Sequence, residues 1–382
     1  MLALRGLGYS TLLVESKSFN SKINSDFDAR SLALSPASQH ILNALGVWEL
    51  VKKFATPINT IHVSNQNSFG ISRLAAKKDV SLGYVLEMQH LNQALYLLQN
   101  KANLLIPATL QSLELDKQFA RVSSPQGVQI IHPRLIVAAD GADSALRRTC
   151  QLPANIKLYQ QQALVANIAL AKPHHHCAYE RFTEHGPLAM LPLQDNRMSL
   201  VWALSAEKIK QMMQISDGQF LKELQLVFGY RLGRFIKLGQ RLCYPLKQVI
   251  MPQLTKWPVV FIGNAAHSLH PVAGQGFNLG LRDVATLAQC ISQYGLEATM
   301  LTEYVKLRRH DQQAIALLTD GLVSLFTSKV PGIGLLRNVG LLAFDQSPFI
   351  KEMLVRYMRG FGGTIPDLVC EIALSSRSLN ES

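Results

Sequence analysis

Charged side chains are scarce in this sequence, and none of its apolar runs is long. Charged residues make up 17% of the 382 residues, against 48% hydrophobic ones. Apolar stretches are interrupted well short of the roughly 18 residues that a membrane span needs, so no transmembrane helix is expected. The N-terminus shows no secretory signal pattern. The composition therefore predicts a globular protein with two or three domains.

Cysteine is also rare, and its spacing argues against disulfides and metal sites. Five cysteines are scattered along the chain, and none forms a Cys-x-x-Cys pair (Cys150, Cys177, Cys243, Cys290 and Cys370). Such a set builds neither a disulfide framework nor a zinc ribbon, so we expect a cytoplasmic protein. The run His174-His-His-Cys177 follows Lys172-Pro173 and has no second ligand cluster. We interpret it as a loop and expect no metal.

Basic residues are in excess, but the other marks of nucleic-acid binding are absent. Lys and Arg number 38 against 26 Asp and Glu, which gives a net charge of +12. No basic cluster with interleaved aromatic residues occurs, so no nucleic-acid partner is expected. An anionic cofactor, an anionic membrane surface and an ordinary solvated surface all remain open as explanations.

The most informative stretch is the segment 259–284. It opens with a short apolar run that predicts a buried strand ending at Gly263. A loop with Gly274, Gly276 and Gly280 follows and passes into Leu279–Ile291, which is apolar at helical spacing. A strand, a glycine loop and a helix start place backbone N–H groups opposite an anion, and glycine lets a planar ligand approach the main chain.

The letters of this segment resemble the second flavin motif of FAD-dependent aromatic-ring hydroxylases. They read Gly263-Asn-Ala-Ala-His267, then His270-Pro271, then Gly274-Gln-Gly276-Phe-Asn278. The resemblance implies that FAD is bound here, with NAD(P)H and O₂ as co-substrates. It implies contacts to FAD from Gly263, Asn264, Gly274, Gln275, Gly276, Phe277 and Asn278. His267 and His270 are candidates for proton handling, because histidine titrates in a useful range, and fixing the loop is the open alternative. Pro271 is expected to shape the substrate side of the flavin.

A second motif lies at 135–147. An apolar strand ends at Asp140-Gly141 and enters a helix, with Ser144 and Arg147 at the spacing D-G-x-x-S-x-x-R of the same hydroxylases. We expect Asp140 and Gly141 to order the FAD loop. Arg147 offers a forked donor that suits a phosphate. Arg30 and Gln89 lie in segments that flank the flavin in the resembled family, and they complete the predicted FAD contacts.

The N-terminal segment fits only the later part of a dinucleotide-binding unit. Met1–Gly8 reads as the last turns of a helix, and Ser10–Glu15 as a buried strand ending in an acid. In that fold a first strand and a G-x-G-x-x-G loop come before this helix, and the acid, here Glu15, binds the adenosine ribose. We therefore expect a start codon assigned too far downstream, with a truncated gene as the alternative.

The motifs together predict an α/β fold with a discontinuous, Rossmann-like FAD-binding domain. We assign residues 1–58, 83–152 and 250–294 to it, lacking its first strand. Residues 59–82 and 153–249 are predicted to form an inserted β-sheet substrate domain, and residues 295–382 a helical C-terminal region. Residues 103–134 alternate in short runs between turns, which predicts a β-meander.

Within the hydroxylases, the resemblance is greatest to the ubiquinone-biosynthesis group, and there to the branch that acts on 2-octaprenyl-6-methoxyphenol. The run Glu180-Arg-Phe-Thr-Glu-His-Gly-Pro-Leu-Ala-Met-Leu-Pro192 and the neutral Asn264 carry this resemblance. It implies hydroxylation of a polyprenylated methoxyphenol. The alternatives are a sibling hydroxylase of another ring position or another aromatic, and a non-catalytic subunit of the biosynthetic complex.

The expected partners follow from that substrate. A prenylated phenol is nearly insoluble in water, so we expect peripheral association with the inner membrane or with a ubiquinone-synthesis complex. The segment Val305–Gly360 is apolar and carries eight basic against four acidic residues, which suits an interfacial surface. Core packing with a solvated face is the alternative.

Overall fold

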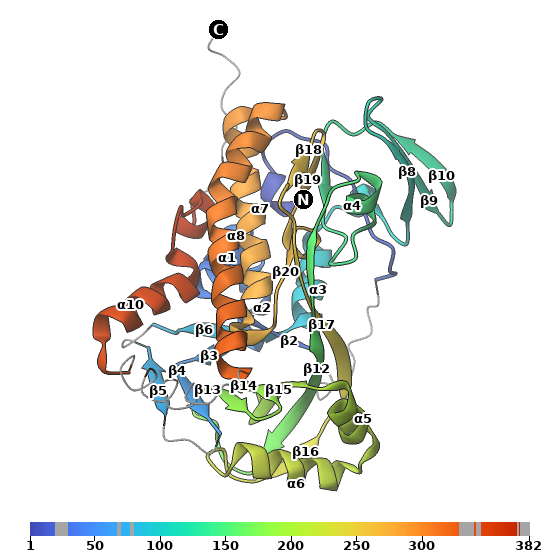
Figure 1. The fold of residues 1–382 in the computed structure, drawn as a ribbon. Coiled ribbons are helices and arrows are strands. Elements are labelled where there is room, and N and C mark those ends of the chain that lie inside the picture. The colour runs from blue at the N-terminus through green and yellow to red at the C-terminus, as the bar shows by residue number, and fades with distance from the viewer. Residues whose placement is uncertain are drawn as a thin grey trace.

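The computed structural model describes residues 1–19, 30–66, 70–76, 80–327, 340, 345–372 and 374. Two parts are visible in Figure 1: an upper part around the long helices α7 (Gln275–Tyr294) and α8 (Ala298–Thr327), and a lower part built on a large sheet. No helix in the described ranges is long and apolar enough to cross a membrane.

The lower part is a mixed nine-stranded sheet. Its order is β20-β17-β12-β15-β14-β13-β4-β5, with β16 pairing beside β12. The strands are β4 (Thr60–Asn65), β5 (Ile71–Ala75), β12 (Asn155–Leu170), β13 (Cys177–Thr183), β14 (Gly186–Leu193), β15 (Arg197–Leu204), β16 (Phe235–Leu238), β17 (Leu242–Ile250) and β20 (His267–Ser268). Segments 59–82 and 153–249 therefore meet in one sheet, because β4 pairs in parallel with β13.

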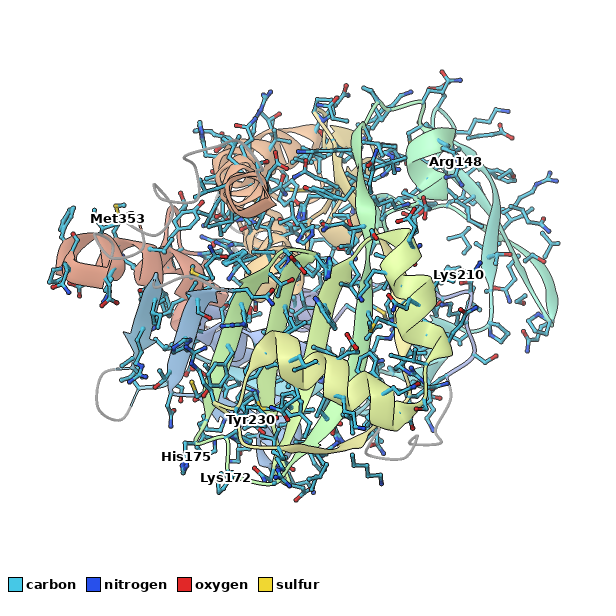
Figure 2. All side chains as sticks on the ribbon, turned by 60° about the horizontal axis from the view of Figure 1, so that its bottom comes forward. Arg148, Lys172, His175, Lys210, Tyr230 and Met353 are labelled. Atoms are coloured by element: carbon cyan, nitrogen blue, oxygen red, sulfur yellow. The ribbon has the colours of Figure 1, made fainter. Side chains whose placement is uncertain are left out.

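The two faces of this sheet differ, because successive side chains of a strand point to opposite sides. Helices α5 (Ala206–Gln214) and α6 (Asp217–Phe228) lie across one face (Figure 2). Between them and the sheet is an apolar core that includes Met190, Trp202 and Phe220, all fully buried. The other face is turned toward the upper part and is left to line a cavity.

The upper part holds several small sheets. Strands β2 (Ser31–Leu34), β6 (Gly83–Glu87) and β3 (Thr56–Ile58) form one of them, and β11 (Ile136–Ala138), β19 (Val259–Phe261) and β18 (Thr255–Lys256) form another. The predicted meander is confirmed as β8 (Thr109–Glu114), β9 (Phe119–Ser124) and β10 (Gly127–Ile131). The helices here are α1 (Pro36–Ala44), α2 (Trp48–Val51), α3 (Met88–Leu98), α4 (Ala145–Thr149), and the short η2 (Lys52–Phe54) and η3 (Lys101–Asn103).

The N-terminal segment departs from its prediction. Met1–Gly8 contains only a 3₁₀ turn, η1 (Leu2–Leu4), before the left-handed Gly6 and Gly8. The predicted buried strand is reduced to β1 (Leu13–Val14), which pairs with β7 (Leu104–Leu105), and both of its residues are exposed. The prediction of burial was wrong because β1 has only this one neighbour among the described strands.

The C-terminal region is helical, as predicted. After α8 come α10 (Pro348–Arg356), the π-helical turn η6 (Tyr357–Phe361) and η7 (Asp367–Cys370). Residues 328–339 and 341–344, between α8 and α10, lie outside the described residues. Helix α10 projects away from the body of the molecule (Figure 1). It is joined to the sheet through Asp345, whose carboxylate accepts from Lys351 Nζ (2.6 Å), Ser72 Oγ (3.0 Å) and the Arg73 amide (3.1 Å).

Candidate active site

A cavity of about 1120 Å³ lies between the two parts of the molecule. Its upper wall is the loop between β19 and α7, and its lower wall is the free face of the nine-stranded sheet. Of the predicted site residues it is lined by Arg30, Gly141, Gly263, Asn264, His270, Pro271, Gly274, Gly276 and Phe277. Two motifs that stand 120 residues apart in the sequence thus meet at one cavity of the size that cofactor sites have.

The loop reaches the cavity through two left-handed glycines. Gly263, in the 3₁₀ turn η4 (Gly263–Ala265), has φ +55°, and Gly274, which ends η5 (Val272–Gly274), has φ +60°. Gly274 is also the N-cap of α7, and no side chain caps this end of the helix. The first amides of a helix have no partners within it, so α7 presents donors and the positive end of its dipole to the cavity.

Gly280 and Gly276 serve different purposes, one in packing and the other in ligand access. A Cβ at Gly280 would stand 3.2 Å from Gly263 Cα, so this glycine lets α7 pack against the loop. A Cβ at Gly276 would meet no protein atom within 4 Å. The space beside Gly276 is therefore cavity, and it is available to a planar ligand.

Asn278 was predicted to contact FAD, but its side chain is occupied by partners within the protein. Its Oδ1 accepts from the Ser35 amide (2.8 Å) and from Ser38 Oγ (2.7 Å), and its Nδ2 donates to the carbonyls of Ala33 (2.9 Å) and Gly274 (2.8 Å). Every hydrogen-bonding position of the amide is used within the protein. Asn278 therefore fastens the start of α7 to β2 and α1. Gln275 is likewise buried, and its Nε2 donates to the carbonyl of Met358 (3.4 Å).

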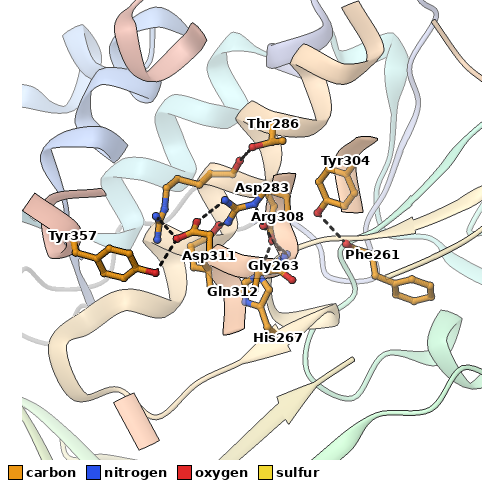
Figure 3. A network of polar contacts seen from close by, with 12 residues as sticks. Phe261, Gly263, His267, Asp283, Thr286, Tyr304, Arg308, Asp311, Gln312 and Tyr357 are labelled. Atoms are coloured by element: carbon orange, nitrogen blue, oxygen red, sulfur yellow. Dashed lines mark hydrogen bonds and ion pairs between the residues drawn. The ribbon is translucent and has the colours of Figure 1, made fainter. Parts of the chain in front are cut away.

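Behind the loop lies a buried ionic network centred on Asp283 (Figure 3). The Asp283 carboxylate accepts from the Gly263 amide (2.9 Å), from His267 Nε2 (2.5 Å), from Arg308 Nε (2.8 Å) and from Gln312 Nε2 (3.0 Å). Burial alone would raise the pKa of Asp283, but the charges of His267 and Arg308 hold it well below its usual range. The network continues from Arg308 to Asp311, which also accepts from Arg282.

The two histidines are placed differently from their predicted roles. His267 is buried and held by Asp283, and it does not line the cavity. His270 lines the cavity, but burial lowers its pKa to about 4, so it stays neutral near pH 7. Its Nδ1 accepts from the Val272 amide (3.3 Å), which places the proton on Nε2, and Nε2 has no partner among the described residues. His270 is thus a neutral donor, because burial disfavours its charged form. The contacts of both histidines match the open alternative, in which they fix the loop.

Arg147 also differs from its prediction. Its guanidinium is buried and donates to the carbonyls of Ala265 (3.1 Å) and Ala142 (2.9 Å). The Arg147 guanidinium, which was predicted to bind a phosphate, therefore joins the two cavity loops to each other. Asp140 accepts from the Leu146 amide (3.0 Å) and orders the start of α4, while Gly141, at φ +85°, lines the cavity.

The three remaining predicted contacts, Arg30, Gln89 and Glu15, lie at the edge of the cavity or outside it. Arg30 is exposed, lines the cavity and stacks over the Tyr244 ring at 4.7 Å. Gln89, on the first turn of α3, has a buried Nε2 with no partner in the described part of the chain. Glu15 is exposed beyond β1, where it accepts from the Lys17 amide (2.8 Å). Neither Gln89 nor Glu15 is among the described residues that line the cavity.

The sequence did not indicate that Asp283 and Arg308 would anchor the loop or that Glu180 would line the cavity. The pair Arg282-Asp283 was visible inside a predicted buried helix, where a carboxylate needs a partner. Its partner Arg308 lies in the segment for which an interfacial surface and core packing both remained open, and it is fully buried. For Glu180, the period-2 pattern of the strand was the signal that could have placed the carboxyl on one face of the sheet.

Comparison with known proteins shows the family of this chain. A family model described as an FAD binding domain matches residues 1–316. This chain belongs to that family. The flavoprotein is also 31% identical over 368 residues to the ubiquinone hydroxylase UbiL of Rhodospirillum rubrum, covering 94% of this chain and 86% of the relative. It is 28% identical to the 3-demethoxyubiquinol 3-hydroxylase of Escherichia coli, with 87% and 88% covered.

Solved structures agree with the predicted fold class. The p-nitrophenol 4-monooxygenase PnpA from Pseudomonas putida superposes on the flavoprotein with a TM-score of 0.76 at 17% identity, over 95% of this chain and 94% of the other. Klebsiella pneumoniae HpxO, complexed with FAD and uric acid, gives a TM-score of 0.73 at 15% identity, over 98% and 94%. The α/β fold of an FAD-dependent monooxygenase is therefore confirmed.

The cavity fits the cofactor of this family. The open space beside Gly276, the uncapped start of α7 and the unpartnered Nε2 of His270 suit a planar ligand with anionic and acceptor groups. The flavoprotein is thus an FAD-dependent monooxygenase, and NAD(P)H and O₂ are the co-substrates of its family.

Proposed function

We propose that this flavoprotein hydroxylates the ring of a polyprenylated methoxyphenol in ubiquinone biosynthesis. The cavity carries the proposal, since it joins the FAD loop to a wall of apolar side chains that includes Ile61, Leu74 and Leu191. Two similar relatives are named as ubiquinone hydroxylases. A ring held against the sheet face would lie between the FAD loop and this wall.

In this proposal FAD supplies the oxygen transfer, at the expense of NAD(P)H and O₂, and the protein positions the reactants. Gly263, Asn264, Gly274, Gly276 and Phe277 would hold the flavin, and Gly141 and Arg30 would flank it. His270 would donate a hydrogen bond from Nε2 into the cavity. Pro271 would form the side of the loop that faces the substrate ring. The apolar wall excludes water from the ring.

The exposed apolar side chains of the C-terminal helices support a second part of the proposal, association with the membrane. On α10, Phe349 is 77% and Met353 59% exposed, and Ile350 is also exposed. Figure 2 shows Met353 at the outer edge of the molecule. The same helices contribute Leu325, Leu354 and Met358 to the cavity wall. A prenyl chain could thus pass from a bilayer along α10 into the cavity, and a ubiquinone-synthesis complex could cover the same surface.

The decisive experiment is lipid analysis of a strain that lacks the gene. We expect a prenylated methoxyphenol, such as 2-octaprenyl-6-methoxyphenol, to accumulate during aerobic growth while ubiquinone is depleted. Accumulation of a different ubiquinone precursor would assign a sibling ring position. Normal ubiquinone with another aromatic accumulating would reject the pathway. Restoration of ubiquinone by a variant that cannot bind FAD would instead indicate a non-catalytic subunit.

A further inference from the structure

The free face of the nine-stranded sheet carries one carboxyl group. On β13 the side chains alternate: Tyr179 and Arg181 point toward α6, where Tyr179 meets the Phe228 ring and Arg181 donates to the carbonyl of Val227. Glu180, between them, points the other way and lines the cavity. Among the described residues of the cavity wall it is the only carboxylate.

The neighbours of Glu180 across the sheet are apolar. The register pairs it with Val63 of β4 on one side and Ala189 of β14 on the other, and Ala189 pairs with Val201 of β15. All of them line the cavity. The basic side chains of this region, Arg73 and Arg181 together with His62, belong to rows of the opposite face.

Glu180 makes no hydrogen bond or ion pair with any described residue, so no contact in the described part of the chain accounts for it. Desolvation raises its pKa to about 7. A carboxylate in an apolar wall costs stability unless a partner satisfies it. A residue kept at such a cost, facing a ligand cavity, indicates a role toward the ligand.

The other titratable groups of the cavity wall do not duplicate this role. Arg30 is a cation, and His270 is a neutral donor with its Nδ1 already occupied by the Val272 amide. Tyr179 packs on the α6 side, and its pKa is raised by burial. Asp320 of α8 is not among the described residues that line the cavity, and its carboxylate accepts from Lys157 and Tyr159. Glu180 is therefore the one charged acceptor on the sheet side of the cavity within the described residues.

We propose that Glu180 binds the ring hydroxyl of the phenol and takes up its proton. This inference rests on the proposed function, because it requires a phenol as substrate. The phenolic O–H bond breaks, its electron pair stays on oxygen as the phenolate, and the proton forms an O–H bond with Glu180. The phenolate pushes electron density to the ring carbons ortho and para to the oxygen, which are the ones that an electrophilic oxygen attacks.

The proton is returned in the same cycle. Once the new C–O bond exists, the attacked ring carbon loses its hydrogen as a proton to water, and the electron pair of the broken C–H bond makes the ring aromatic again. Glu180 then gives its proton back to the ring oxygen and is regenerated as the carboxylate. The oxygen atom and the electrons come from O₂ and NAD(P)H in the established flavin reaction, so Glu180 needs no further co-reactant.

The test compares Glu180→Gln with Glu184→Gln, a matched control on the same segment whose side chain is 73% exposed. We expect Glu180→Gln to keep its FAD and its KM and to lose kcat at neutral pH by about 10²–10⁴-fold, the usual contribution of a general base. Its rate should recover at high pH, where the phenol ionises unaided, and with fluorinated, more acidic phenols. Glu180→Asp should retain part of the rate, and Glu184→Gln all of it.

A second measurement does not depend on turnover. At about pH 9, where a carboxyl group with a pKa of about 7 is ionised in the absence of ligand, binding of a soluble methoxyphenol to the FAD-loaded wild type should produce the infrared C=O stretch of a protonated carboxyl group. Glu180→Gln should lack this band, and so should the wild type with the phenol's methyl ether, which has no proton to give. Absence of the band in the wild type, or an unchanged pH profile in Glu180→Gln, would overturn the proposal. A wild type that binds FAD but leaves prenylated methoxyphenols unchanged would instead reject the proposed function.

Discussion

At Gly276 an added Cβ would meet no protein atom within 4 Å and would stand in open cavity. Gly276→Val should therefore fold normally while its methyl groups occupy the space proposed for the flavin. We expect FAD affinity to fall by roughly tenfold or more, as an overlap of 1–3 kcal/mol implies. Gly218→Val on α6 is the control, since that position is also open but lies off the cavity. Flavin titration and thermal unfolding separate the two effects. Full flavin content in Gly276→Val would show that the ligand lies elsewhere.

Glu180 also predicts a pH dependence of stability. Its pKa rises from the ordinary 4.5 to about 7 on folding, so the folded state binds this proton more tightly than the unfolded state. The resulting stabilisation is present below pH 4.5 and is lost as the pH rises through 7. We expect a loss on the order of 1 kcal/mol, because water in the cavity screens the charge. Denaturant unfolding between pH 5 and 8 should show it, and Glu180→Gln should remove this component of the pH dependence.

At the scale of elements, Asp283 ties α7, α8 and the FAD loop together. Replacing it with Asn leaves the buried guanidinium groups of Arg308 and Arg282 to share the single carboxylate of Asp311, and breaking a buried pair in this way costs about 3–5 kcal/mol. Asp143→Asn is the control: Asp143 also pairs with a cation, Lys247, but its side chain is 84% exposed, so at most about 1 kcal/mol should be lost. Urea unfolding measures both variants. Equal stabilities would mean that the network contributes little.

Helix α10 makes the membrane proposal testable. Burying each large apolar side chain contributes about 1.5–3 kcal/mol, so Phe349→Ser with Met353→Ser should weaken binding to anionic vesicles more than tenfold. Leu226→Ser on α6 is a matched control, because Leu226 is 75% exposed on the other side of the sheet. Co-sedimentation with vesicles gives the comparison. If the wild type stays in solution, the surface of α10 has another partner.

At the scale of the whole molecule, local patterns could be predicted and distant partners could not. The strand, loop and helix around Gly263 and Gly276 follow from neighbouring letters, and the predicted elements are present. Asn278 was assigned to the cofactor by the resemblance, and Arg147 because its forked side chain can donate to a phosphate. Their partners, Ser35 and Ala265, lie 243 and 118 residues away. Spacing in a sequence shows what a side chain can bind, but only the fold decides what it meets.

The parallel pairing of β4 with β13 has a consequence for how the protein is made. Strands β4 and β5 pair with each other early, but their neighbour β13 begins only at Cys177. At about 5–20 residues per second, roughly 5–20 s of synthesis separates the two. A two-stranded hairpin alone is marginally stable in water. Until β13 is synthesised, the edge of β4 in the lower wall of the cavity therefore stays unpaired. Chaperones or a second nascent chain can bind this edge before β13 does.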